Sequence, residues 1–260
     1  MSLQPHLKYK EGDVSKYVLL PGDPKRVLKI VEFFDKAEKV AENREMLTYR
    51  GTYKGLDLTV TSTGMGCPSA AIALEELANI GAEVFVRIGT CGTLKEGINY
   101  GDIIIPTAAI RAEGTTKEYI EPEFPAVADL DVLNSLIASA KENNIPHHVG
   151  INRTHDAFYE HLDNMLRWGN IFKDKRMSTW PSPVVSSEME CSAVFLIAHL
   201  RGLKAGAVLA VNTLEPLNKI VEDPDLIYHL EESPDAAKGL DRAIQTALDG
   251  LVIFDKKSKK

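Results

Sequence analysis

Short apolar segments alternate with helical segments along most of the chain, and this alternation limits the folds open to it. The segments AEVFVRIG, GDIIIPTAAI and KAGAVLAVNT are apolar on both faces, which is typical of strands buried in a parallel sheet. Four segments have helical patterns: CPSAAIALEELANIG, DVLNSLIASAKENN, SSEMECSAVFLIAHLRG and PDAAKGLDRAIQTALDGLVIF. The pattern predicts an α/β fold with a mixed, mostly parallel central sheet flanked by helices.

The 260 residues show no internal repeat and no linker-like segment, so we expect one domain covering 1–260. KYVLLPGDPKRVLKIVEFF is predicted to form a strand, a turn and a helix. LTYRGTYKGLDLTVTSTG is predicted to form two strands joined at Lys54 and Gly55. The region from about Glu160 to Val185 is the least regular and is expected to be a lid-like insertion, and the tail DKKSKK is expected to fray.

Composition narrows the classes of partner. A net charge of -7 argues against a general nucleic-acid binder, although a few focused arginines can still bind a small anion. Cys67, Cys91 and Cys191 are an odd number without a C-x-x-C pair, which argues against a disulfide framework and a cysteine zinc site. The start lacks an apolar leader, and the chain lacks an apolar run of about 18 residues. We therefore expect a cytoplasmic protein that does not cross a membrane.

Arg87 stands inside the apolar strand VFVRIGTCG, from Val84 to Gly92. A buried charge without a partner is strongly destabilising, so a buried Arg87 requires an anionic partner. The sequence therefore raises the question of which anion this guanidinium meets.

Three predicted strands end in similar glycine turns: LPGDPKR, TSTGMGCPS and RIGTCG. The carboxyl ends of parallel strands meet at one edge of a sheet, where glycine lets backbone N–H groups approach an anion. Arg26 and Arg87 would add forked donors suited to phosphate, and Thr90 a hydroxyl. Each turn alone is also compatible with an ordinary strand-to-helix connection, but the three together favour an anion site.

Two further motifs each allow two interpretations. GMGCPS, from Gly64 to Ser69, resembles a dinucleotide-binding fingerprint with Ser69 at the third glycine, so an NAD-binding oxidoreductase stays an alternative. In SSEMEC, Ser187 and Glu190 fit a helix-capping box, whereas Glu188 or Glu190 could instead grip a polyol such as a ribose diol.

Six motifs in order, LPGDPKR, NREMLTYRGTYKG, STGMGCPS, RIGTCG, HDAFY and SSEMEC, resemble the nucleoside phosphorylase-I family. The resemblance runs from about His6 to Asn212. It implies an enzyme that cleaves the N-glycosidic bond of a nucleoside with inorganic phosphate as co-substrate and without a cofactor. Retention of the phosphate-site arginines favours a phosphorylase over a hydrolytic nucleosidase, and a non-catalytic nucleoside- or anion-binding protein is the remaining alternative.

The resemblance also implies roles for individual residues. The catalytic residues are Arg26, Arg87 and Glu190. The phosphate-binding residues are Gly22, Arg26, Arg44, Arg87 and Thr90. The nucleoside-binding residues are His6, Phe158, His161, Glu188, Met189 and Glu190.

The same resemblance implies a homo-oligomer, with a hexamer built as a trimer of dimers as the family norm. His6 and Arg44 resemble residues that cross a subunit interface. Glu45, Met65, through its carbonyl, and Ser69 correspond to positions that hold a potassium ion in some uridine phosphorylases.

The identity of the base rests on departures from the family patterns. Purine-specific members carry Ser-Asp where this chain has Asn212 and Thr213, which speaks against purines. Uridine phosphorylases carry a Gln-x-Arg pair after the Phe-Tyr, and that pair is absent here. The candidates to replace it are His161, Arg167, Lys173, Lys175 and Arg176. The Val-Asn pair is more similar to the uridine branch. We therefore expect uridine as the substrate, with purine nucleosides as the alternative.

Overall fold

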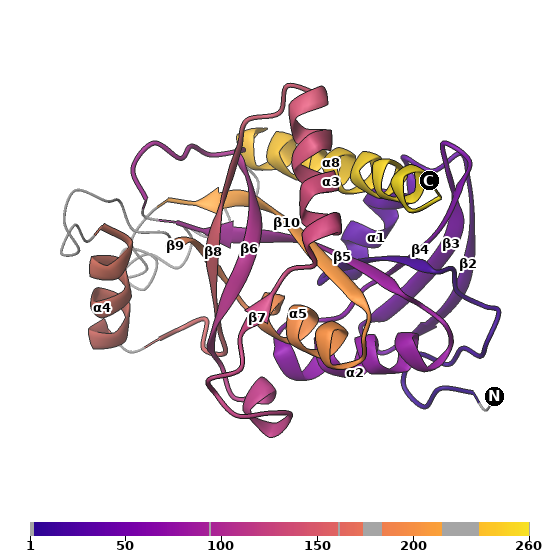
Figure 1. Cartoon of the computed structure of the whole chain (residues 1–260), viewed down its shortest axis with the longest axis horizontal. Helices are drawn as coiled ribbons and strands as arrows, with labels where there is room; N and C mark the ends of the chain where they lie inside the picture. The colour runs from indigo at the N-terminus through magenta and orange to yellow at the C-terminus, as the bar shows by residue number, and fades with distance from the viewer. Residues whose placement is uncertain (1–2, 94, 161, 174–183, 215–233, 260) are drawn as a thin grey trace.

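The computed structural model describes residues 3–93, 95–160, 162–173, 184–214 and 234–259. The described chain forms one ten-stranded sheet with helices on both faces (Figure 1). Its strands are β1 Tyr17–Pro21, β2 Lys36–Asn43, β3 Met46–Tyr53, β4 Leu56–Thr61, β5 Val84–Gly92, β6 Ile103–Ala112, β7 Ala126–Val127, β8 His147–His155, β9 Val184–Glu188 and β10 Lys204–Thr213. Its α-helices are α1 Pro24–Val31, α2 Cys67–Asn79, α3 Leu130–Glu142, α4 Leu162–Lys173, α5 Cys191–Leu200 and α8 Pro234–Ser258, and a short 3-10 helix covers Thr115–Glu118.

Strand β5 joins the two halves of the sheet. It pairs in parallel with β1 and with β10, and β1 pairs in parallel with β4. On the other side, β10 pairs with β6, β6 with β8 and β8 with β9, and β9 returns to β5 at Gly92. These pairings close a ring of five strands, from which β1, β4, β3 and β2 extend. The predicted α/β class and mixed sheet are confirmed.

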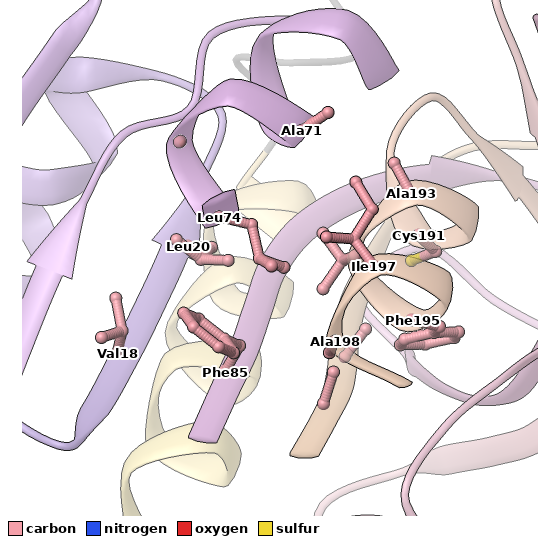
Figure 2. Close-up of a cluster of buried hydrophobic side chains, with 14 of the residues drawn as sticks. Val18, Leu20, Ala71, Leu74, Phe85, Cys191, Ala193, Phe195, Ile197 and Ala198 are labelled. Carbon is pink, nitrogen blue, oxygen red and sulfur yellow. The ribbon is translucent and has the colours of Figure 1, made fainter. Parts of the chain in front are cut away.

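The sheet separates two apolar cores, as expected for strands that are buried on both faces. Alternating residues of β1 face opposite ways: Val18 and Leu20 pack toward α2 and α5, whereas Tyr17 and Leu19 belong to the core under α1, α3 and α8. Figure 2 shows part of the first core, where Leu74 of α2 lies near Leu20 and Phe85. None of the described helices is long and apolar enough to cross a membrane.

The helix starts follow the signals in the sequence. Asp23 accepts the backbone N–H of Lys25 at 2.8 Å and so caps α1, which begins at Pro24. Helix α2 has Pro68 in its first turn, as expected, and ends just before Gly81, which has a φ of 103°.

Four expectations need correction. Strand β2 is absent from the predicted elements, because five of its eight residues, KAEKVAEN, are charged or polar. SSEMEC is not the start of a helix, since β9 continues through Glu188 and α5 begins at Cys191. Residues 162–173 form the regular helix α4, while 174–183 lie outside the described residues. The tail is helical through Ser258, because Asp255 accepts from Tyr17 Oη at 2.9 Å and from Lys259 Nζ at 2.6 Å.

Candidate active site

The three glycine turns lie side by side, because β4, β1 and β5 are neighbouring parallel strands. Gly64 N–H donates to the Gly22 carbonyl at 3.0 Å, and Thr63 N–H donates to the Pro21 carbonyl at 2.9 Å. A Cβ on Gly22 would stand 3.2 Å from the Gly64 carbonyl oxygen, so the two loops leave little room for a side chain there. The predicted meeting of the strand ends is therefore observed.

Arg87 is buried, with a relative exposure of 5%, and its partners belong to the chain itself. Its Nε donates to Glu188 Oε2 at 2.9 Å, and its Nη2 forms an ion pair with Glu190 Oε2. Burial opposes the charge, but Glu190 and Glu188 outweigh it and raise the pKa of Arg87. The sequence suggested an external anion as the partner, whereas the structure pairs the charge with two carboxylates.

Glu188 is held by a dense set of donors. Its Oε1 accepts from Asn152 Nδ2 and Thr154 Oγ1, each at 2.7 Å. Its Oε2 accepts the backbone N–H of Glu190 at 2.7 Å, and both oxygens accept from Cys191 N. Burial favours the neutral acid, yet Arg87 and the Thr154 hydroxyl hold the pKa of Glu188 below its usual range. This carboxylate therefore fixes the start of α5.

These contacts correct one prediction. The capping box of Ser187 and Glu190 is wrong, because Ser187 lies in β9 and its Oγ donates to the Arg153 carbonyl at 3.3 Å. Glu190 occupies the N-cap position of α5 without a side-chain capping bond. Glu188 provides the capping acceptor instead, and its predicted contact with a nucleoside stays a prediction.

Glu190 connects three elements at the same edge. Its Oε1 accepts the backbone N–H of Gly66, at the start of α2, at 2.5 Å, and its Oε2 meets Arg87 of β5. Burial raises the pKa of Glu190, with Arg87 opposing the rise and Glu188 adding to it. Of the two buried carboxylates, Glu190 has fewer hydrogen-bond partners in the structure, the Gly66 N–H and Arg87, than Glu188. Met189 beside it is half-buried, and its carbonyl accepts from Cys67 Sγ at 3.3 Å.

Arg26 reaches the same edge from the first turn of α1. Its Nη1 donates to the Ile88 carbonyl at 3.3 Å, next to Arg87 in the chain. Thr90 follows on β5 and is half-buried. Gly22, Arg26 and Arg87 therefore lie at the same edge of the sheet, and Thr90 follows near the end of β5; their binding of phosphate stays a prediction.

The fifth residue predicted to bind phosphate, Arg44, lies elsewhere. It is exposed in the turn between β2 and β3, with a φ of 54° that side-chain-bearing residues rarely adopt. His6 also lies apart from Arg87, but it is well anchored: its Nδ1 lies 2.6 Å from Glu76 Oε1, and the backbone N–H groups of His6 and Leu7 bind the same carboxylate. The predicted interface roles of Arg44 and His6 stay predictions.

Two of the three residues at the predicted potassium position are in contact. Ser69 Oγ donates to Glu45 Oε1 at 2.9 Å, and the backbone N–H of Glu45 and the Ser69 hydroxyl lower the pKa of this carboxylate. Met65 is 85% exposed. Among the described residues, no cluster of three His, Cys, Asp or Glu side chains could hold a metal ion. A potassium site with carbonyl and hydroxyl ligands therefore stays a prediction.

The candidates for the base side gather after β8. Phe158 is 42% exposed and packs edge-to-face on Tyr159, with ring centroids 5.1 Å apart. Arg167 is exposed on α4, and Lys173 is the last residue of that helix. The other candidates, His161, Lys175 and Arg176, lie outside the described residues.

The dinucleotide-binding alternative loses support, and the cysteines offer no reactive thiol. In the GMGCPS loop the Gly66 N–H, which a pyrophosphate would need, donates to Glu190, and Ser69 bonds Glu45. The three cysteines are buried and reduced, and burial raises the pKa of the Cys91 thiol, so this thiol is not poised as a nucleophile.

Sequence reasoning missed a second set of buried polar residues on β8: Asn152, Arg153, Thr154 and His155. The signal was present in INRTH, where an arginine stands inside a strand as Arg87 does in VFVRIG. Arg153 was overlooked because the family motif nearest to it, HDAFY, begins two residues later.

Comparison with known proteins agrees with this geometry. The family model described as the phosphorylase superfamily matches residues 16–248. Uridine phosphorylase of Thermococcus kodakarensis is 44% identical over 80% of this chain and 76% of its own length. Guanosine phosphorylase of Halorubrum lacusprofundi is 41% identical over 96% of this chain and 99% of its own length.

Solved structures show the same likeness. Uridine phosphorylase of Vibrio fischeri superposes with a TM-score of 0.82 at 34% identity, covering 97% of this chain and 98% of that one. Purine nucleoside phosphorylase of Toxoplasma gondii, in complex with immucillin-H, superposes with a TM-score of 0.83 at 31% identity, covering 100% and 98%. The match over most of the chain, in sequence and in structure, shows that this protein belongs to the phosphorylase superfamily.

Proposed function

We propose that this protein is a nucleoside phosphorylase, a pentosyltransferase that converts uridine and phosphate to uracil and ribose 1-phosphate. The observation that carries the proposal is the buried ion pair of Arg87 and Glu190 at the edge where the Gly22 and Gly64 loops meet. This pair places a guanidinium that can donate hydrogen bonds to phosphate beside a carboxylate that can accept hydrogen bonds from a diol.

Phosphate would enter by exchanging partners with Glu190. A phosphate oxygen has the charge and geometry to replace the Glu190 carboxylate on Arg87 Nη2, while Glu188 keeps its bond to Arg87 Nε. Arg26 and Thr90, on neighbouring elements, supply further donors. The exchange releases Glu190, whose two oxygens can then accept from the 2′- and 3′-hydroxyls of a ribose.

Catalysis in this arrangement is a matter of orientation and electrostatics. Positive charge develops on the sugar as the glycosidic bond breaks, and Arg26 and Arg87 would hold the phosphate dianion against it in a buried site. Glu190, fixed on the Gly66 N–H, would align the ribose for attack at C1′. These three residues are the proposed catalytic group.

Uridine is the proposed substrate because the chain carries Val-Asn near the end of β10 and lacks the Ser-Asp of purine enzymes. The uridine phosphorylases of Thermococcus kodakarensis and Vibrio fischeri support this choice. One observation favours a purine nucleoside as second candidate: the guanosine phosphorylase of Halorubrum lacusprofundi is matched over 99% of its length.

The proposal extends to the setting of the enzyme. We expect a cytoplasmic protein of nucleoside salvage that needs no cofactor and assembles as a homo-oligomer, with a hexamer as the family norm. The exposed position of Arg44 and the anchored His6 support an interface role for both. Light scattering coupled to gel filtration measures the assembly, and activity with potassium or sodium as the only monovalent cation tests the site at Glu45 and Ser69.

The deciding experiment is a base-release assay with uridine, thymidine, inosine, guanosine and adenosine, each with and without phosphate. We expect phosphate-dependent release of uracil to be the fastest reaction. Equal rates without phosphate would identify a nucleosidase instead, and faster cleavage of guanosine or inosine would select the purine alternative. No cleavage of any substrate would leave a binding protein.

A further inference from the structure

An ion pair closes the loop that follows β8. Arg153 and Glu160 lie seven residues apart, and their side chains are 4% and 5% exposed. Arg153 Nη1 donates to Glu160 Oε2 at 3.2 Å, and Nη2 pairs with Oε1, so the contact is bidentate. A bidentate guanidinium–carboxylate contact fixes orientation as well as distance.

Helix α4 is attached to the same pair. The ring of Trp168 lies 4.4 Å from Arg153 Cζ, and Asn164 Nδ2 donates to Glu160 Oε1 at 3.1 Å. Figure 1 shows α4 at the margin of the molecule, apart from the helices that cover the sheet. The buried pair therefore joins this helix to the end of β8.

The closed loop carries two exposed aromatic rings. Phe158 and Tyr159 are 42% and 72% exposed, although they pack on each other. Two further bonds fix the loop: His155 Nδ1 lies 3.0 Å from the Ala157 carbonyl oxygen, and Gly114 N–H donates to Asp156 Oδ2 at 2.8 Å. Exposed aromatic rings on a hydrogen-bonded loop suit stacking on a flat ligand ring such as a nucleobase.

The register of the sheet places this loop beside the Arg87 cluster. Thr154 pairs with Glu188 across β8 and β9, and its hydroxyl binds the Glu188 carboxylate. The loop that carries Phe158 therefore starts next to the end of β9, and β9 leads directly to Glu190.

We propose that Arg153, Glu160 and Trp168 form a clamp that positions Phe158 and Tyr159 against the base of the nucleoside. Arg153 and Glu160 are positioning residues in this scheme, and they act through Phe158. The inference rests on the proposed function for the nature of the ligand. A buried ion pair can often be replaced by apolar residues without loss of stability. The proposed role of Arg153 and Glu160 is therefore to fix the position of the aromatic pair rather than to stabilise the fold.

The test replaces both members, Arg153→Met with Glu160→Met, so that no unpaired charge stays buried. We expect KM for the nucleoside to rise about tenfold, because base stacking on the aromatic pair weakens. KM for phosphate and kcat should stay near the wild-type values. Arg201→Met, which removes an exposed ion pair with Glu75, is the matched control and should change none of these constants. Should the double variant not fold, Arg153→Lys keeps the cation without the fork and should raise the same KM by a smaller factor.

A double-mutant cycle with Phe158→Ala separates the clamp from a merely structural role. If the clamp acts through Phe158, adding the two clamp substitutions to Phe158→Ala should raise the nucleoside KM little above that of Phe158→Ala alone. An unchanged nucleoside KM in the clamp variant, or independent effects that multiply in the cycle, would overturn the inference. Failure of the proposed function looks different, because the wild-type enzyme would then release no base in the presence of phosphate.

Discussion

Arg87 and Glu190 form a buried ion pair across two elements that are about 100 residues apart in the chain. Arg87 comes from the middle strand of the sheet, and Glu190 stands at the start of α5. The pair lies at the junction of the Gly22 and Gly64 loops, so the chain itself holds Arg87 in place at the point where the proposed phosphate and ribose diol would meet.

The first prediction concerns Arg87→Lys. Lysine keeps the charge but lacks the planar fork that directs Nε to Glu188 and Nη2 to the proposed phosphate, so we expect kcat/KM to fall by about 10²–10³-fold, the scale of removing one oriented donor. Steady-state kinetics with varied phosphate checks this. Lys16→Gln, which removes an exposed pair with Glu83, should leave kcat/KM unchanged. A lysine variant with wild-type phosphate kinetics would contradict the role of Arg87.

The second prediction compares the two carboxylates. Glu190→Gln should lower kcat/KM for uridine by about 10²-fold while lowering it less for 2′-deoxyuridine, because a deoxyribose offers the carboxylate one hydroxyl fewer. Equal losses on both substrates would show that Glu190 does not read the diol.

The matched variant Glu188→Gln should act mainly on stability. Glu188 accepts from a guanidinium, an amide, a hydroxyl and two backbone N–H groups, and a neutral amide cannot accept from all of them. We expect the free energy of unfolding to fall by about 2–3 kcal/mol, the scale of losing charged hydrogen bonds. Denaturant unfolding measures it, and a stability equal to that of Glu190→Gln would argue against the structural role.

The sequence predicted the fold class and the meeting of two glycine turns, for a local reason. Apolar runs and glycine turns are short-range signals, so they located β1, β4 and β5 and hence the meeting of Gly22 with Gly64. The pairing of Arg87 with Glu188 and Glu190 is a contact between distant segments, and no local pattern records it. Arg153 was not predicted for the same reason, because its ion pair with Glu160 depends on the conformation of the loop after β8.

The capping box failed for a related reason. Ser187 and Glu190 have the right spacing, but β9 pairs with β8 and keeps Ser187 extended, so tertiary pairing overrides the local preference. In β2 the polar, exposed residues gave no strand period, and pairing with β3 alone sets its conformation.

A third prediction uses two glycines with similar backbone angles. Gly64 and Gly55 have φ values of 73° and 78°, so alanine strains both. A Cβ at Gly64 would also lie 2.7 Å from Glu45 Cγ and 2.9 Å from Ser69 Oγ, whereas one at Gly55 meets nothing within 4 Å. Gly64→Ala should therefore lose more stability and raise KM for phosphate, while Gly55→Ala loses only the strain energy of about 1 kcal/mol. Thermal unfolding and phosphate kinetics compare them, and equal effects would contradict the crowding at Gly64.

The last prediction is a pH dependence of stability. Burial and the neighbouring Arg153 lower the pKa of His155, although Glu160 opposes them. The unfolded imidazole titrates near pH ~6.5, so as the pH falls through that value the unfolded chain binds a proton that the folded chain does not. The stabilisation is therefore complete above about pH 6.5 and is lost progressively as the pH falls toward the folded pKa. His155→Gln should flatten this part of the curve, measured as the free energy of unfolding between about pH 5 and 8. A wild-type curve that runs parallel to the His155→Gln curve would show that another group controls acid stability.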